Sequence, residues 1–363
     1  MDDLALWMAL ASVPGMHLHR YQKIIANVPL ADFFQASPTE LQHFGLTERQ
    51  SQMLLSPNHA RIERAVAWLL ADQRRHLVRC IDPNYPPLLK QLKQPPLALF
   101  VTGNLDLLHS PQLAIVGSRQ PTPTAKQIAY DFAATLSRHG LTITSGLAQG
   151  IDGAAHSGAL SVNGQTIAVL GHGLQHHYPK QHAALTAQIA EQGALVSEFL
   201  PDVPAKPEFF PLRNRIVVGL SMGTLVVEAA LKSGSLISAN YAAEYNREVF
   251  AIPGSIYNPQ AAGCHLLIQQ GAKLTTCPAD ILDELNVSSA TGLNKSVAHK
   301  NNCQQDLFES SLLANVGDEA TAIDVIAMRA QQTVAEVSIA LLQLELSGEV
   351  AAVPGGYIRV RRA

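Results

Sequence analysis

The spacing of apolar residues predicts short helices over residues 1–78. Leu4, Trp7 and Leu10 form one face of a helix, and Val13-Pro14-Gly15 interrupts it with a tight turn. A helix–Pro-Gly–helix unit either offers backbone N–H groups to phosphate or serves as a packing module. Basic and acidic residues nearly balance in this segment, which favours the packing module.

Two further helices are predicted before the pattern changes. Ser37-Pro38-Thr39-Glu40 has the residue types of a helix start, with Ser37 as the N-cap and Glu40 as the third residue. A second amphipathic pattern runs from Ile62 to Leu70. From residue 79 to 110 prolines recur and exclude a central strand or a helix interior, so we expect an extended connector with one short strand, Ala98–Val101.

Short β-rich runs alternate with helical stretches from residue 113 onward. The predicted strands are Leu113–Val116, Leu141–Thr144, Thr166–Leu170, Ala194–Ser197, Thr224–Val227, Val249–Ile252 and Lys273–Thr275. The predicted helices include Ala125–Arg138, Asp152–Ser161, Gln181–Gln192 and Leu236–Tyr245. The alternation predicts an α/β fold with a doubly wound, largely parallel, Rossmann-like sheet. Ligands of such sheets bind at the carboxyl ends of the strands, which directs attention to the loops there.

The last part of the chain changes character again. Residues 288–306 are rich in Ser, Asn, Lys and Gln and indicate a linker. Residues 307–363 follow the order helix, helix, strand, turn, strand, as at the end of a winged-helix domain. We therefore expect a helical module (1–78), an α/β domain (79–287), a linker (288–306) and a winged helix (307–363).

Composition and charge narrow the class of protein. The chain has 363 residues, of which 47% are hydrophobic and 6% aromatic, and this suits an α/β protein with a core of small aliphatic side chains. The net charge of −3 means that any binding of a polyanion depends on a local cluster of cations. Residues 306–363 hold 4 basic and 8 acidic residues, so this winged helix is a poor candidate for duplex DNA and protein docking is favoured.

The compartment follows from cysteines and from the N-terminus. The four cysteines form no CxxC pair, which gives a structural zinc site little support and suggests a reducing compartment. Asp2 and Asp3 stand where a signal peptide carries basic residues, and no segment approaches about 20 unbroken apolar residues. We expect a cytoplasmic protein that does not contact a membrane.

The loop after the first strand of the α/β domain has residues suited to phosphate. Gly117 permits a close turn, Ser118 offers a hydroxyl and Arg119 offers a planar fork of donors. GxxxxGK[ST] and GxGxxG are both absent, so neither a Walker loop nor a dinucleotide site is predicted, and we expect no cofactor. An ordinary turn with a surface arginine is the competing interpretation.

The next two loops add backbone access and cations. The second begins at Ser145 and Gly146 and is rich in glycine, so its backbone can approach a ligand, and Asp152 is predicted to cap the following helix. His156 is expected to pack or to form a hydrogen bond rather than to act as a base. In the third loop His172 and His176 have spacing compatible with a metal, but no acid or cysteine accompanies them, so we predict no metal site. Lys180 is the better candidate there.

The densest signal lies between Lys206 and Ser221. Arg213, Asn214 and Arg215 stand where an apolar helix is expected to begin, an arrangement that favours phosphate. The competing interpretation pairs both arginines with Glu208 and Glu228. Phe209 and Phe210 could stack on bases, although a core position is favoured for them. In the fifth loop Gly234 and Ser235 form an anion-friendly turn with Ser235 as the expected N-cap.

Seven ordered motifs resemble the DNA-processing protein A (DprA/Smf) family. They are IVGSR at 115–119, SGLAQGIDGAAH at 145–156, YPK at 178–180, FPLRNRIVVGLS at 210–221, VVEAALKSGSLISA at 226–239, AIPGSIYNP at 251–259 and GCHLLIQQGA at 263–272. One departure is His265, where many relatives carry asparagine. The helical N-terminus, SAM-like or helix-hairpin-helix-like, and the winged helix also fit the family's architecture.

The resemblance implies a DNA-binding protein rather than an enzyme. Members of the family bind single-stranded DNA without sequence preference, protect incoming strands in natural transformation, help to load the RecA recombinase, and form homodimers through the Rossmann-like domain. The resemblance carries the DNA contacts over to Gly117, Ser118, Arg119, Lys180, Lys206, Arg213, Asn214 and Arg215. We add Ser145, Gly146, Gly234 and Ser235 from the glycine-rich loops.

Two consequences and two alternatives complete the expectation. About four neutralised phosphates would give a salt slope near −3, and replacing Arg119 or Arg213 by alanine should weaken binding while the fold survives. The segment Gly223–Glu228 is similar to the GTxxxE part of LOG-type nucleotide phosphoribohydrolases but lacks their Pro-Gly-Gly. A duplex-binding regulator that uses the winged helix is the third possibility, and its acidic charge argues against it.

Overall fold

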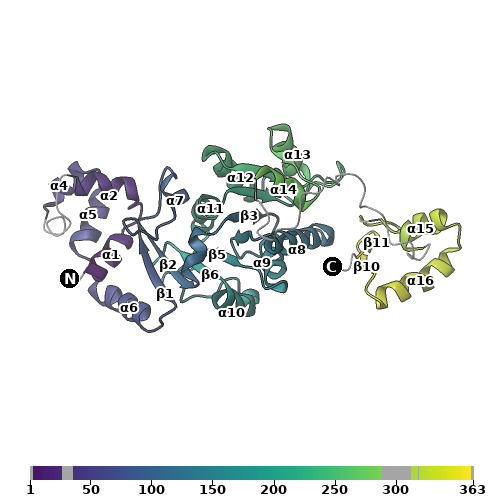
Figure 1. Cartoon of the computed structure of the whole chain (residues 1–363), viewed down its shortest axis with the longest axis horizontal. Coiled ribbons are helices and arrows are strands. Elements are labelled where there is room, and N and C mark those ends of the chain that lie inside the picture. Colours follow the sequence, from purple (N-terminus) through teal and green to yellow (C-terminus); the bar gives the residue numbers. More distant parts are fainter. Residues whose placement is uncertain (1–2, 27–35, 288–311, 318, 361–363) are drawn as a thin grey trace. The chain divides into compact units, whose positions relative to one another are not determined.

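The computed structural model describes residues 3–26, 36–287, 312–317 and 319–360, which form two compact units. The larger unit holds the N-terminal helices and the sheet, and the smaller unit holds the C-terminal helices and a hairpin (Figure 1). The linker predicted at 288–306 lies outside the described residues.

The N-terminal segment folds into short helices, as its apolar spacing predicts. They are α1 (Asp3–Ala11), α2 (Leu18–Ile25), α4 (Pro38–His43), α5 (Glu48–Leu55) and α6 (His59–Leu70). Ser37 and Glu40 form the expected capping box at the start of α4. Trp7, Tyr21 and Leu41 are buried between the helices and belong to the same hydrophobic cluster as Leu99 and Val101, so the segment shares its core with the rest of the larger unit.

The Pro-Gly turn between α1 and α2 has its backbone groups already engaged. Gly15 has a φ of +75°, which favours glycine. The Leu18 amide donates to the Pro95 carbonyl at 3.1 Å, and the Arg20 amide donates to Nδ1 of His17 at 3.4 Å. Because these N–H groups at the start of α2 are used internally, the packing interpretation is favoured over phosphate binding.

The helical module is joined to the α/β domain by an apolar contact and an ion pair. Met8 and Ile62 belong to the same buried cluster as Phe100 and Leu200. Beside it the guanidinium of Arg61 binds the Asp202 carboxylate, with Nε–Oδ1 at 2.9 Å and Nη2–Oδ1 at 2.8 Å. Asp202 lies in the loop that leads to α11 (Phe209–Leu220), so the first helices hold that loop directly.

In the described part of the chain nine strands form a single twisted sheet. They are β1 (Arg75–Arg79), β2 (Ala98–Gly103), β3 (Gln112–Val116), β4 (Thr142–Ser145), β5 (Thr166–Leu170), β6 (Ala194–Ser197), β7 (Gly223–Val226), β8 (Glu248–Ala251) and β9 (Lys273–Leu274). Their order is β1-β2-β6-β5-β4-β3-β7-β8-β9. The strands from β3 onward are parallel, and β2 is antiparallel to both of its neighbours. The prediction of helix up to residue 78 is wrong for the residues of β1, which extend the sheet.

Helices cover both faces of the sheet, as expected for a doubly wound fold (Figure 1). They are α7 (Pro87–Lys90), α8 (Pro123–Arg138), α9 (Ile151–Ser161), α10 (Ala183–Gln192), α11, α12 (Ser235–Glu244), α13 (Ala262–Gln269) and α14 (Pro278–Glu284). Leu113 and Ile115 of β3 pack with α8 and α9, whereas Ala114 and Val116 face the cluster that includes α11 and α12. β3 lies between β4 and β7, so the direction of winding reverses between β3 and β7.

The smaller unit has the order that the sequence predicts for a winged helix. Its elements are η3 (Leu313–Asn315), α15 (Ile323–Ala330), α16 (Val334–Leu346), β10 (Val350–Val353) and β11 (Gly356–Arg359). Among the described residues no single helix is long and apolar enough to cross a membrane, and only α15 and α16 together meet that length and composition, with a 106° bend between them.

Candidate nucleic-acid interface

A pocket of about 380 Å³ opens at the carboxyl ends of β3, β4 and β5, beside the first turn of α11. Its lining residues are Arg119, Gly146, Leu147, Ala148, Gln149, Leu170, Gly171, His172, Tyr178, Pro179, Lys180, Gln181, Phe210 and Arg213. Arg119, Gly146, Lys180 and Arg213 are therefore brought together as the sequence predicts. The pocket lies at the carboxyl ends of parallel strands, where such sheets bind their ligands, and it extends from β3 toward β4 and β5 rather than toward β7.

Exposed cations and aromatic rings form the mouth of this pocket. Arg119 and Lys180 are both exposed. The Arg119 guanidinium carbon lies 5.6 Å from the centre of the Phe210 ring, and the Tyr178 and Phe210 ring centres are 5.3 Å apart. Phe210 was expected in the core and instead lines the pocket. A wall that offers a fork of donors next to two rings suits a phosphate with an attached base.

Arg213 forms the floor of the pocket rather than part of its rim. It is only 4% exposed, and its Nη1 donates to the Gly146 carbonyl at 2.6 Å and also to the Val169 carbonyl. A Cβ at position 146 would lie 2.4 Å from Nη2 of Arg213, so only glycine fits above this side chain. Burial lowers the pKa of Arg213 to about 10, while the charge of Asp152 acts in the opposite direction. Arg213 thus places a positive charge at the floor of the pocket and links the loop after β4 to β5.

Asp152 organises the glycine-rich loop from inside the protein. Its Oδ2 accepts hydrogen bonds from the amides of Gly146 at 3.1 Å and Ala148 at 3.2 Å, and burial raises its pKa. The expectation that Asp152 is the N-cap of α9 is wrong. The N-cap is Gly150, whose φ is +85°. Glycine is required there because a Cβ would lie 2.3 Å from the Ser118 carbonyl oxygen.

The loop after β3 offers fewer free groups than its sequence suggests. The Ser118 amide donates to the Glu228 carbonyl at 2.8 Å and its Oγ accepts from the Gln120 amide at 3.1 Å. Gly117 fits because a Cβ would lie 2.6 Å from the Ile151 side chain. Ser145 is fully buried, and its hydroxyl donates to the Ile115 carbonyl at 2.6 Å. Gly117, Ser118 and Ser145 therefore position Arg119 and the pocket wall.

The RNR segment divides between two sides of its helix. α11 begins at Phe209, so Arg213, Asn214 and Arg215 lie in its second turn and not at its N-terminus. Oδ1 of Asn214 accepts from Nε of Arg213 at 3.2 Å. Nη2 of Arg215 binds Oε2 of Glu198 at 2.6 Å, a different carboxylate from the two considered above.

The surroundings of Arg215 place it away from the pocket. Burial is the main cause of the lowered pKa of His17 and of the raised pKa values of Tyr85 and Tyr245, and the charge of Arg215 acts on all three groups. Tyr85 precedes α7 and Tyr245 follows α12, the two helices that α11 contacts on this side. Its Nη1 is buried without a hydrogen-bond partner among the described residues. We therefore leave Arg215 out of the proposed contacts.

Lys206 and the turn before α12 lie outside the pocket lining. Lys206 is exposed with its Nζ 5.6 Å from the centre of the Phe209 ring, and that ring stacks on Phe199 with centres 4.4 Å apart. Gly234, not Ser235, is the N-cap of α12, and the Ser235 amide donates to Oγ of Ser233 at 3.2 Å. Lys206 can extend the cationic path of Arg119 and Lys180, whereas Gly234 and Ser235 are not among the residues that line the pocket.

The histidines near the site form hydrogen bonds with backbone carbonyl groups. His172 lies 3.0 Å from the Gly173 carbonyl through Nδ1, and His176 lies 2.9 Å from the Asp202 carbonyl through Nε2. Across the described residues no group of three or more His, Cys, Asp or Glu side chains could share a metal ion. His265, the departure from the family pattern, lies with Nε2 2.9 Å from the Gly254 carbonyl and so links α13 to the loop after β8.

His156 is a buried structural histidine that should make the fold sensitive to acid. The Thr166 hydroxyl donates to the Ile143 carbonyl, so Nδ1 of His156 donates to Thr166 Oγ1 at 2.7 Å. Burial, with help from the charges of His182 and Arg213, lowers the pKa of His156 to about 3. Below about pH 6.5 the imidazole of His156 binds a proton in the unfolded chain but stays neutral in the folded chain. The free energy of unfolding should therefore fall by up to about 1.4 kcal/mol for each unit by which the pH is lowered.

Urea unfolding at pH values from about 7 down to about 5 measures this loss. In the His156→Asn variant the amide can still donate to Thr166 but cannot titrate, so its unfolding free energy should depend less steeply on pH. Equal slopes for the two proteins would contradict the assignment.

A large hollow of about 630 Å³ beside β1 has less to offer a ligand. Its arginines are already engaged: Arg79 pairs with Asp3 and Asp82, and Nη1 of Arg75 donates to the Trp68 carbonyl at 2.6 Å. The smaller pocket, with its exposed Arg119 and Lys180, is the better candidate for an anionic ligand.

A helical module, a doubly wound sheet with a cation-lined pocket at the carboxyl ends of its strands, and a winged helix together define a three-part protein class. The family of DNA recombination-mediator protein A has a model that matches residues 76–286, and the chain belongs to this family. The SMF/DprA SAM domain matches residues 1–67, and the DprA winged helix domain matches residues 299–356.

Individual relatives agree with this assignment. The chain is 48% identical to Protein Smf of Escherichia coli K12 over 371 residues, covering 100% of this chain and 97% of that protein. The X-ray structure of DNA processing protein A from Streptococcus pneumoniae superimposes with a TM-score of 0.69 at 33% identity, covering 78% of this chain and 99% of that one. DNA processing protein A from Helicobacter pylori, whose structure concerns a single-stranded DNA binding mode, gives 0.54 at 31% identity and covers 59% and 96%.

Proposed function

We propose that the pocket beside β3 binds single-stranded DNA without sequence preference. The observation that carries the proposal is the joint exposure of Arg119 and Lys180 at a pocket walled by Phe210 and Tyr178. The cations pair with phosphates of any sequence, and the rings accept the face of any unpaired base. The bases of a duplex are stacked and paired, so they cannot use the rings in the same way.

Family membership and relatives support the same function. The Helicobacter pylori relative is described as binding single-stranded DNA. Bound strands would be protected in natural transformation and passed to the RecA recombinase, as the family resemblance implies. A homodimer would present two such pockets to one strand, which raises the effective affinity without new contacts. We propose a binding role and no catalytic step.

The test compares labelled single-stranded and duplex oligonucleotides of one sequence over about 50 to 200 mM salt. Arg119, Lys180 and Lys206 are three exposed cations, so the slope of log K against log salt should be near −2, at about 0.7 per phosphate. This is shallower than the slope near −3 expected from the sequence, because Arg213 and Arg215 are engaged internally. Tighter binding of the duplex, or a slope near zero, would contradict the proposal.

The phosphoribohydrolase alternative makes an opposite prediction. It requires the carboxylate of Glu228 to reach a nucleotide, and Glu228 is buried at 4% exposure behind the loop of Ser118. Incubation of the purified protein with AMP should release no adenine, and release at an enzymatic rate would favour the alternative.

A further inference from the structure

The smaller unit exposes an apolar stripe on α16, the second of its two helices. Ile339 is 64% exposed, Leu342 56% and Leu346 82%, while Val337 and Leu341 on the other face are buried in the unit's core. With the exposed Ala335 the stripe reads 335, 339, 342, 346, a spacing of four, three and four residues. This spacing is that of the seam between two paired helices. We propose that α16 pairs with α16 of a second copy of this chain in antiparallel orientation.

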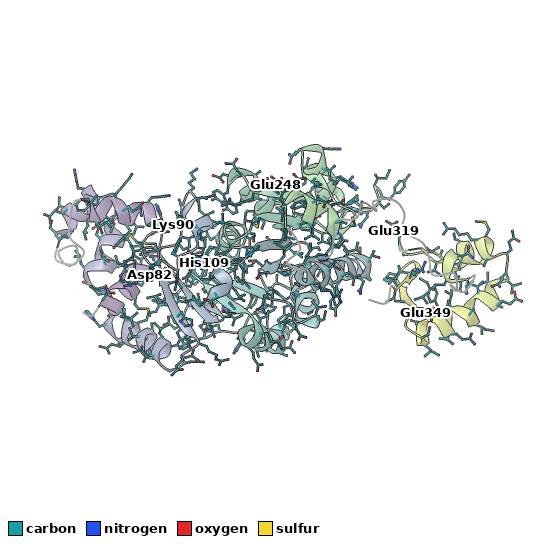
Figure 2. All side chains as sticks on the ribbon, viewed as in Figure 1. Asp82, Lys90, His109, Glu248, Glu319 and Glu349 are labelled. Carbon is teal, nitrogen blue, oxygen red and sulfur yellow. The ribbon has the colours of Figure 1, made fainter. Side chains whose placement is uncertain are left out.

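Charge excludes a nucleic acid as the occupant of this stripe. The segment Val334–Leu346 has no lysine or arginine, and its charged residues are Glu336 and Glu345. Elsewhere in the described part of this unit, Glu319 and Glu349, labelled in Figure 2, and Asp324 outnumber Arg329 and Arg359, so the unit is acidic on balance. DNA binding needs cationic side chains that replace the counterions of the phosphates. This helix has none, and its two carboxylates would repel the phosphates. An apolar partner surface fits instead.

The sizes of the stripe residues favour an antiparallel copy. Pairing that sets Ile339 opposite Leu342 also sets Ala335 opposite Leu346 at both ends, so a small side chain meets a large one. A parallel pair would face Ala335 with Ala335 and leave a gap there, which costs packing energy. A twofold axis makes every such contact twice, as in an isologous interface.

The flanking charges are compatible with the same arrangement. Glu336 follows the stripe position 335 and Glu345 precedes the position 346, so the two carboxylates lie on opposite sides of the seam. Glu336 and Gln343 lie on one flank of the stripe, and Ser338 and Glu345 lie on the other. In an antiparallel pair each flank faces the same flank of the second copy, so Glu336 comes near Gln343 and Glu345 comes near Ser338. The Glu336 carboxylate is also held by the amide of Thr333 at 2.9 Å. No carboxylate faces another across the seam.

Disulfide cross-linking of the full chain tests both the contact and its direction. The background replaces the exposed Cys277 and also Cys303 by serine. A mixture of Ala335→Cys and Leu346→Cys proteins should form a mixed disulfide dimer under mild oxidation, whereas Ala335→Cys alone should form at least tenfold less. Adding Leu342→Glu to both proteins should lower the yield at least tenfold. Ala352→Glu places the same charge at an exposed position of β10 and should leave the yield unchanged.

Each other outcome overturns the proposal. Absence of a mixed dimer means that the stripe serves a different protein. Equal yields from Ala335→Cys alone mean parallel or random contact, and a yield insensitive to Leu342→Glu means proximity without a seam. Leu342 is exposed, so circular dichroism should show the same fold in the charged variant. Single-stranded DNA binding is measured separately and does not decide this result.

Discussion

Replacing Arg213 by alanine is expected to lower the free energy of unfolding by about 3 to 5 kcal/mol. The guanidinium of Arg213, which is only 4% exposed, satisfies the carbonyls of Gly146 and Val169. Its removal leaves both acceptors unpaired and leaves the buried carboxylate of Asp152 without its compensating charge. The expectation from sequence, that binding weakens while the fold survives, therefore does not apply to this arginine.

Denaturant unfolding of Arg213→Ala, with Arg138→Ala as the matched control, measures the effect. Arg138 is exposed in the last turn of α8, so its removal should change stability by no more than about 0.5 kcal/mol. Arg213→Lys keeps the charge but loses the fork of donors, and it should fall between the two. A midpoint for Arg213→Ala equal to that of the control would show that the floor of the pocket does not depend on this side chain.

Removing Arg119 and Lys180 together should weaken single-stranded DNA binding about a hundredfold, roughly tenfold for each charge-assisted contact. Both side chains are exposed at the pocket mouth, so the loss should be similar for all sequences and the melting temperature should be nearly unchanged. The slope of log K against log salt should also become shallower by about 1.4.

The matched control removes two exposed cations elsewhere, Lys93 and Arg138, which do not line the pocket. Equal losses in both double variants would mean that only the overall charge matters and that the pocket is not the binding site. Single variants of Arg119 and Lys180 then show whether the two contacts are additive, as expected for side chains that bind different phosphates.

The fold could be predicted from sequence because its signals are local. Short, nearly continuous apolar runs such as Thr166–Leu170 and Ala194–Ser197 match β5 and β6 residue for residue, as expected for strands that are buried on both faces. The capping box at Ser37 fixed the start of α4 in the same way. β1 was missed because its sequence, RHLVR, mixes charged and apolar residues at an edge of the sheet, where only pairing with β2 makes it a strand.

The site was only partly predictable because residue type does not reveal burial. The loops that carry Arg119, Gly146, Lys180 and Arg213 follow from the rule on strand ends. The sequence could not show that Arg213 points inward, because residue type does not reveal which face of α11 packs against the strand ends. Because both lie in one helix, positions 213 and 215 fall about 200° apart around its axis, which separates the two arginines. Phe210 could have been found by the same phase, since it lies one turn before Arg213.

The ion pair between Arg61 and Asp202 connects the N-terminal helices to the loop beside the binding site. Asp202 belongs to the same loop as Lys206. That loop leads into α11, whose Phe210 ring packs against the Arg119 guanidinium. A molecule that tilted the first helices would pull this loop away from the pocket. Coupling of this kind is reciprocal, so a DNA strand bound in the pocket would oppose the tilt by the same free energy. Binding at the pocket and the position of the N-terminal helices would then depend on each other.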